Sequence, residues 1–259
     1  MKRSAIAIAA TAAALSFTAQ AQMSGDTIKI GMITDLSGVY SDIDGNGGAE
    51  AVRMAIADLG GAVAGKKIQF MVSDHQNKPD IAASKAREWF DQQGVDMLIG
   101  GTNSGASLAM AKVAAEKKKV FISIGAGTAQ LTNEQCSPYT VHYAYDTVAL
   151  ARGTGSAVLK QGGKSWYFLT ADYAFGQVMT HDASAVIEAA GVKVLGTANH
   201  PLGTNDFASF LLQAQSSGAK VIGLANGGGD MGAKRHHHPP DAAGDRPTAE
   251  PCAVQQLDL

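Results

Sequence analysis

The stretch Met97–Ala115, MLIGGTNSGASLAMAKVAA, decides the fold of this chain. It begins with a short apolar run at Met97–Ile99, typical of a buried strand, and Gly100 and Gly101 then turn the chain. Hydroxyl and amide side chains follow where a helix should begin, and small apolar residues dominate from Gly105 onward. Such a helix points free backbone N–H groups and its positive dipole end toward the carboxyl edge of the sheet. Because ligands bind at that edge in open α/β sheets, the stretch predicts an α/β fold with a binding site.

The same arrangement recurs at Val120–Thr128, VFISIGAGT, where an apolar run again passes into glycines and a hydroxyl side chain. One such turn alone is more often an ordinary glycine-rich connection in which a serine caps the helix. Two turns of this design on successive strands favour a ligand site at their common edge.

Residues 1–21 have the organisation of a secretory signal. Two basic residues near the start precede an alanine-rich apolar run at Ala5–Phe17, and Ala19–Ala21 fits the small-x-small rule of a signal peptidase site. The apolar run is too short to span a bilayer. We therefore expect cleavage before Gln22, export, and a periplasmic location in a bacterium.

Composition and motifs argue against several classes of function. The net charge is −2 without a basic stripe, so nucleic acid is not an expected partner. Cys136 and Cys252 lie far apart and no Cys/His spacing suits a metal, so we expect neither a metal nor a cofactor. No GxSxG, HExxH or P-loop pattern is present, and the main hypothesis is a protein that is not an enzyme.

Strands and helices alternate along the first half of the chain. The expected strands are Ile28–Thr34, Lys67–Ser73, Val95–Ile99 and Val120–Ile124, and the expected helices are Ala49–Leu59, Pro79–Gln92 and the segment after Ser104. Asp35–Gly48 is predicted as a loop because it is rich in Gly, Asp and Ser. Continuous apolar strands that alternate with helices predict a parallel sheet covered on both faces, with right-handed crossovers.

The pattern restarts after Gly125–Tyr145, a mixed segment predicted to cross between two lobes. The second half is predicted to contain a helix at Thr147–Gln161, a strand at Ser165–Thr170, a loop at Ala171–Gln177 with a helix from there to Ala190, a strand at Val192–Thr197, a helix at Asp206–Ser216 capped by Thr204 or Asn205, and a strand at Val221–Ala225. We therefore expect an N-terminal lobe at residues 22–145 and a second lobe at 146–230.

Residues 231–259 break this pattern. They hold His236–His238, four of the seven prolines and little apolar periodicity, so we expect an irregular tail that cannot complete a sheet. Three adjacent histidine side chains diverge, and they are not expected to bind a metal. A frame shift in the gene near residues 227–235 would explain the change in composition. Translation of the other two frames would contradict this hypothesis if no βα pattern continued there.

The assembled residues resemble the extracytoplasmic solute-binding proteins of ABC importers, of the branched-chain amino acid (Leu/Ile/Val-binding) type. The resemblance rests on the order and spacing of three segments, which are IKIGMITDLSGVYSDIDGNGGAEAVRMAI at Ile28–Ile56, IGGTNSGASLAMAKVAAEKKKVFISIGAGT at Ile99–Thr128 and ADYAFGQ at Ala171–Gln177. It implies a type I periplasmic binding protein fold, with two Rossmann-like lobes of parallel sheets that close on a ligand and then dock on a membrane permease. Members are considerably longer, so the chain resembles a C-terminally truncated member with an incomplete second lobe. We therefore expect low stability, and ligand binding that is weak or absent.

The resemblance also places the contacts to a ligand carboxylate. By position they fall on the turn around Ser104 and on Gly125, Ala126, Gly127 and Thr128. A carboxylate there would meet the hydroxyls of Ser104 and Thr128 and backbone N–H groups at helix starts.

Three aromatic residues and one acid complete the predicted site. Tyr40 either walls the pocket or is an ordinary surface aromatic residue of its loop. One of Tyr173 and Phe175 is expected to face the ligand, while the other packs. Asp230 falls where the family has an acid that pairs with a ligand ammonium. If Asp230 has that role, an amino acid is favoured; if it does not, a small carboxylate such as an aromatic acid fits equally well.

The main hypothesis is therefore an ABC-importer binding protein that works by closing around its ligand. One alternative is the ligand-sensing domain of a receptor, which a DNA-binding module or a membrane anchor would distinguish. The other is an exported α/β enzyme with Asp35, Asp172 and Asp230 as candidate acids, although these lie on three separate loops without a neighbouring histidine.

Overall fold

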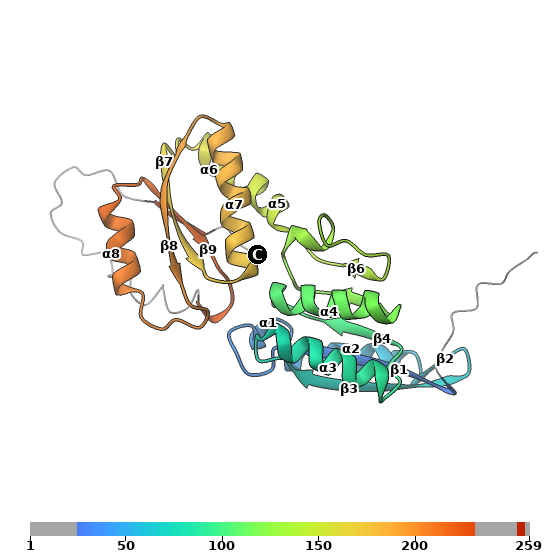
Figure 1. The fold of residues 1–259 in the computed structure, drawn as a ribbon. Coiled ribbons are helices and arrows are strands. Elements are labelled where there is room, and N and C mark those ends of the chain that lie inside the picture. Colours follow the sequence, from blue (N-terminus) through green and yellow to red (C-terminus); the bar gives the residue numbers. More distant parts are fainter. Residues whose placement is uncertain (1–24, 231–252, 257–259) are drawn as a thin grey trace, which may run out of the picture.

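The computed structural model describes residues 25–230 and 253–256. They form two β-sheets, each accompanied by helices, that lie side by side (Figure 1). The first sheet comes from the first half of the chain and the second from the remainder. We call each sheet with its helices a lobe. Parallel pairing dominates both sheets, as the sequence predicts.

The first sheet has six strands, and only its short β2–β3 pair is antiparallel. In spatial order the strands are β2 (Ala62–Val63), β3 (Lys66–Asp74), β1 (Thr27–Thr34), β4 (Met97–Gly100), β5 (Val120–Ser123) and β6 (Thr140–His142). The register aligns Thr34 with Asp74, and Gly100 with Ser123. The loops that follow β1, β3, β4 and β5 therefore leave the sheet at one edge.

Three long helices accompany the first sheet. They are α2 (Asn46–Asp58), α3 (Pro79–Asp91) and α4 (Ser104–Lys117). The start of α3 is a proline, whose fixed φ and missing N–H suit the first helical position. Helices α3 and α4 pack against each other, and the core beneath them buries Trp89, Met110 and Leu98. Helix α2 instead buries only Ala49, and its Met54 is 61% exposed.

The prediction of a loop over Asp35–Gly48 is wrong in its second half. A short helix, α1 (Ser41–Asp44), and the first turn of α2 occupy this region. The glycines here allow close packing as well as turning, because a Cβ atom at Gly48 would lie only 3.1 Å from the Cε atom of Met32.

The second sheet has four parallel strands. In spatial order they are β10 (Ala253–Gln256), β9 (Val221–Ala225), β7 (Ser165–Ala171) and β8 (Lys193–His200). The prediction that residues 231–259 cannot complete a sheet is wrong for 253–256, which pair with β9. A ladder needs only backbone N–H and C=O groups, which a segment of any polarity can supply. His236–His238 lie outside the described residues.

Helices α7 (Ala174–Ala189) and α8 (Ala208–Ser216) lie on opposite faces of the second sheet (Figure 1). Side chains alternate along β7, as they do in any strand. Trp166 and Phe168 pack in the core that contains α7, whereas Leu169 packs with Ala214 of α8. The strand is therefore buried on both faces.

The segment between the lobes differs from the prediction in two ways. Residues 125–145 do more than connect the two lobes, because they also contain β6, which pairs with β5 at the edge of the first sheet. The expected helix over Thr147–Gln161 is divided into three parts, which are α5 (Thr147–Leu150), a π-helical turn (Ala151–Gly155) and α6 (Ser156–Lys160). Two glycines in the turn, Gly153 and Gly155, weaken the regular helix at this point.

The start of α8 also differs from the prediction. Asp206, expected inside the helix, lies before it and accepts a hydrogen bond from the N–H of Ala208 through Oδ1 (2.9 Å). Thr204, one of the two expected caps, instead donates its hydroxyl to the carbonyl of Pro201 (2.6 Å).

Helix α7 starts inside the predicted loop Ala171–Gln177 because Gly176 lets it touch the ends of two strands. A Cβ atom at Gly176 would overlap the carbonyl oxygen of Ala171 and lie 2.9 Å from that of Ala225. Within the described residues, no helix is long and apolar enough to cross a membrane.

We expect Gly176→Ala to lower the free energy of unfolding by about 1–3 kcal/mol, because the added methyl group meets rigid backbone. Gly47→Ala is the matched control, since a Cβ atom there meets nothing within 4 Å, and it should leave stability unchanged or raise it by up to about 1 kcal/mol. Urea unfolding followed by circular dichroism measures both. Equal midpoints for the two variants would contradict this account of the helix start.

Candidate functional site

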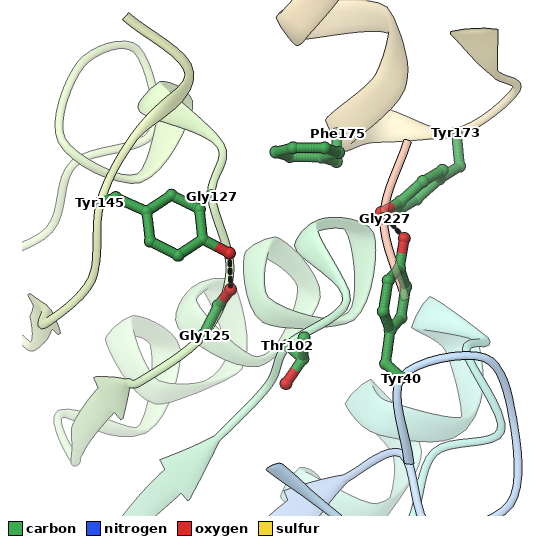
Figure 2. A pocket seen from close by; sticks show the side chains of 8 residues that line it. All are labelled: Tyr40, Thr102, Gly125, Gly127, Tyr145, Tyr173, Phe175 and Gly227. Carbon is green, nitrogen blue, oxygen red and sulfur yellow. Dashed lines mark hydrogen bonds between the residues drawn. The ribbon is translucent and has the colours of Figure 1, made fainter. Parts of the chain in front are cut away.

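A pocket lies between the two lobes and is lined mainly by loops that follow strands of both sheets (Figure 2). The space between its walls is narrow and partly open to solvent. The residues that line it are Tyr40, Thr102, Gly125, Gly127, Tyr145, Tyr173, Phe175 and Gly227. None of these side chains is charged, and four are aromatic, so the pocket suits a ligand with an apolar body.

Two rings close on the backbone at Gly127. A Cβ atom there would lie 2.7 Å from Cε2 of Phe175 and 2.8 Å from Cε2 of Tyr145. Figure 2 shows the two rings projecting from opposite sides of the pocket, one from each lobe. Only glycine leaves room for both rings beside this backbone.

Tyr40 and Tyr173 join the lobes on the other side of the pocket. Their hydroxyls are hydrogen-bonded to each other, and their ring centroids are 6.2 Å apart (Figure 2). Burial raises the pKa of both phenols, and the nearby charge of Asp230 adds to the rise. Both hydroxyls therefore stay protonated at neutral pH and can donate hydrogen bonds.

Tyr145 donates its hydroxyl to the carbonyl of Gly125 at 3.3 Å. Burial raises the pKa of Tyr145 to about 12, and the charge of Asp44 contributes to the rise. Asp44 is itself buried and accepts a hydrogen bond from the hydroxyl of Thr34 (2.7 Å). Burial raises the pKa of this carboxyl group, while the hydroxyls of Thr102 and Thr34 oppose the rise.

A row of backbone amides follows β5 at the edge of the pocket. Within the described part of the chain, the N–H groups of Gly125, Ala126, Gly127 and Thr128 have no hydrogen-bond acceptor. Free backbone N–H groups beside a pocket can donate hydrogen bonds to a bound anion. The buried hydroxyl of Ser104 likewise has no partner among the described residues.

The helix cap at α4 is Asn103, not the serine of the simpler interpretation. Asn103 Oδ1 accepts a hydrogen bond from the N–H of Ala106 at 2.9 Å. Ser104 is therefore the first helical residue, and its side chain is fully buried. Thr128 caps a short 3-10 turn, Ala129–Leu131, where its hydroxyl accepts from the N–H of Gln130 (3.3 Å).

The structure places five of the nine predicted residues on the pocket wall, which are Tyr40, Gly125, Gly127, Tyr173 and Phe175. Both Tyr173 and Phe175 line the pocket, although only one was expected to do so. The other four predicted residues, Ser104, Ala126, Thr128 and Asp230, are buried but do not line it.

Asp230 is hydrogen-bonded within the second lobe. Its Oδ1 accepts a hydrogen bond from the N–H of Gly203 at 2.9 Å. Its carboxylate is nevertheless close enough to Tyr40 and Tyr173 to act on the pKa of both phenols.

Three pocket residues were not predicted. Thr102 follows the glycines at the end of β4, and Gly227 begins the glycine run after β9, so the position of a residue after a strand could have indicated them. Tyr145 follows β6, a strand that the sequence did not reveal, and no signal marks it. Among the described residues, no group of three or more His, Cys, Asp and Glu could hold a metal, and Cys136 is an exposed free thiol.

Two lobes, each built on a sheet of mainly parallel strands, with a pocket at the strand ends, define the class of two-lobed ligand-binding proteins. A sequence model of the family described as periplasmic binding protein matches residues 27–233. The chain belongs to this family.

Solved structures support the assignment. A periplasmic binding protein of Burkholderia mallei is 64% identical over 82% of this chain and 57% of that one, with a TM-score of 0.79. A branched-chain amino acid ABC transporter ligand-binding protein of Burkholderia xenovorans is 34% identical (83% and 59% covered, TM-score 0.64). An ABC transporter solute-binding protein of Rhodopseudomonas palustris, in complex with 3,4-dihydroxybenzoic acid, is 28% identical (82% and 59% covered, TM-score 0.72). The chain also spans about half, 51%, of the length of the curated relatives that it matches.

We expect the Tyr145 phenol to ionise with a midpoint near pH 12, compared with about 10 for a free tyrosine. The fold favours the protonated phenol. Its contribution to stability is therefore complete below the pKa of the unfolded chain, about 10, and is lost as the pH rises through the higher pKa of Tyr145 in the folded protein. A tyrosinate absorbance titration of the native chain and of Tyr145→Phe measures the difference. A Tyr145 midpoint near pH ~10 in the folded protein would show that the ring is not buried.

Proposed function

We propose that this chain is the ligand-capturing part of a periplasmic solute-binding protein of an ABC importer, and that its ligand is a small aromatic carboxylate. The observation that carries the proposal is an aromatic pocket that adjoins a row of unpaired amides. The ligand would be captured between the lobes and delivered to a membrane permease. The role is binding, without a chemical reaction.

The amides after β5 would hold the carboxylate. The N–H groups of Gly125–Thr128 have no acceptor in the described structure, and Gly125 and Gly127 line the pocket, where an anion would accept from the N–H groups that face it. The hydroxyls of Thr102 and Ser104 lie at the same sheet edge, after β4. Hydrogen bonds to an ionised acceptor are about twice as strong as neutral ones, so this end would fix the orientation of the ligand.

The rings would hold the body of the ligand. Phe175 and Tyr145 enclose the pocket from opposite lobes, and Tyr40 and Tyr173 close a third side. Aromatic rings attract one another at centroid distances of about 4.5–7 Å, in offset or edge-on arrangements. One of the neutral phenols of Tyr40 and Tyr173 donates to the other, and the remaining O–H would donate to a polar substituent on the ligand ring.

The absence of a charged side chain from the described pocket lining favours a simple carboxylate over an amino acid. A bound ammonium group would need a carboxylate partner, because an unpaired buried charge is strongly unfavourable. Asp230, expected in that role, is not on the pocket wall and accepts from Gly203. The relative that binds 3,4-dihydroxybenzoic acid shows that proteins of this fold accept such ligands.

An amino acid is the second candidate, and one observation favours it. The charge of Asp230 raises the pKa of Tyr40 and of Tyr173, so its carboxylate lies near two phenols that line the pocket. Asp230→Asn separates the two candidates. It should leave the binding of an aromatic acid within about twofold, and it should abolish the binding of an amino acid.

Isothermal titration of the full chain with benzoate, 3,4-dihydroxybenzoate, L-leucine and benzyl alcohol tests the proposal. We expect the two aromatic acids to bind and benzyl alcohol, which lacks the carboxylate, to bind at least about tenfold more weakly. A preference for L-leucine over both acids would contradict the proposed ligand class.

The matched pair of variants is Gly127→Ala and Gly47→Ala. A methyl group at residue 127 meets both Phe175 and Tyr145, so we expect a loss of benzoate affinity of about tenfold or more. The same change at residue 47 meets nothing within 4 Å and should not alter the affinity. Equal affinities would show that the ligand does not occupy this pocket.

A further inference from the structure

The loop that follows β1 carries two of the hydrogen bonds that join the lobes. We call residues 36–40 the β1 loop. The carbonyl of Val39 accepts from the N–H of Gly229 at 2.8 Å, and the hydroxyl of Tyr40 pairs with that of Tyr173. A Cβ atom at Gly228 would overlap the Val39 carbonyl, so the second lobe presses closely on this loop.

One buried carboxylate fixes the β1 loop from inside. Asp35 has no exposed surface, and no ion pair to it exists among the described residues. Its Oδ1 accepts from the N–H groups of Ser37 (3.3 Å) and Gly38 (2.7 Å). Its Oδ2 accepts from the N–H of Tyr40 (2.9 Å) and from Nδ2 of Asn77 (2.6 Å).

The same hydrogen-bond chain continues to the start of α4. Asn77 Oδ1 accepts from Nδ2 of Asn103 at 3.2 Å, and Asn103 in turn caps α4 at Ala106. The carboxylate of Asp35 is thus connected at one end to an aromatic wall of the pocket and at the other to the helix start beside it. Neither end depends on a contact between Asp35 and the ligand, because Asp35 does not line the pocket.

We propose that Asp35 is the positioning residue of the ligand site, which holds the β1 loop in the conformation that brings Tyr40 to the pocket and lets the lobes close. The inference rests on the proposed function in one respect, which is that its binding test uses the proposed ligand class. The charge of Asp35 is compensated by four hydrogen bonds, and charge-assisted bonds of this kind hold a loop more firmly than neutral ones.

The arrangement needs an acceptor at both oxygens. Asn in place of Asp35 would keep the shape but turn one accepting atom into a donor. In one amide orientation that donor would face Ser37 and Gly38, and in the other it would face Tyr40 and Asn77. Two hydrogen bonds are lost in either orientation, so the loop loosens and fewer molecules have a closed site. The apparent affinity for a ligand falls in the same proportion.

Titration of the full chain with benzoate tests the binding consequence. We expect Asp35→Asn to weaken binding by about tenfold. Ile187→Val is the control for a general loss of stability, since Ile187 is fully buried in the core of the second lobe, on α7. It should lower the thermal midpoint without changing the affinity.

A tyrosinate absorbance titration tests the positioning without any ligand. In the native chain, burial keeps the pKa of Tyr40 above its usual value. We expect one additional tyrosine of Asp35→Asn to ionise close to the ordinary pKa of about 10. The additional ionisation should be absent from the double variant Asp35→Asn/Tyr40→Phe. Loss of the Asp35 charge also lowers the pKa of Tyr40 directly, so Asn77→Gly, which keeps this charge, is the variant in which a Tyr40 shift reports the position of the loop.

Asn77→Gly provides a milder second variant in case Asp35→Asn does not fold. Asn77 has a φ of 56°, a conformation that glycine adopts freely, so this change removes the side-chain bond without backbone strain. It should shift both readouts in the same direction by a smaller factor. Unchanged affinity and an unchanged tyrosine titration in a folded Asp35→Asn would overturn the proposal. A shifted titration of Asn77→Gly in a chain that does not bind benzoate would support the positioning role and refute only the proposed ligand.

Discussion

The register of the parallel strands is the constraint on which the rest of the structure depends. Thr34 pairs with Asp74, and Gly100 pairs with Ser123, so successive loops emerge side by side at one edge of the first sheet. The loops after β7 and β9 contribute to the pocket from the second sheet. A pocket assembled in this way needs no special strand chemistry, because backbone pairing alone brings distant parts of the sequence together.

Within that frame, the site combines free amides with neutral aromatic side chains. Gly127 serves both components, since it exposes its own N–H group and leaves space for Phe175 and Tyr145. Burial keeps the tyrosines of the pocket protonated, so none of them adds a negative charge that would repel an anion. The electrostatic preference of the site therefore comes from the backbone.

Much of the fold could be predicted from the sequence, because β5 and β9 are short, mainly apolar runs and the apolar residues of β1 stand between turn residues. The family resemblance indicated both the amides after β5 and the aromatic residues after β7. Tyr145 could not be found in this way, since its place depends on β6, whose short sequence TVH has no distinctive pattern. The group that the Asp230 carboxylate faces could not be predicted for a related reason. Whether a carboxylate faces a pocket or a neighbouring N–H group depends on a backbone rotation that composition does not determine.

Helix α2 shows how unevenly the first lobe is held together. Its buried contact is limited to Ala49, while Met54 and the adjoining Leu59 are 61% and 60% exposed. Segments with few buried apolar contacts open locally at a much lower free energy than the global unfolding of the domain. Amide hydrogens of α2 will consequently exchange with solvent far sooner than those of α4, which buries seven residues. The first lobe thus combines a well-buried layer of β4, β5 and α4 with a helix that has few buried contacts.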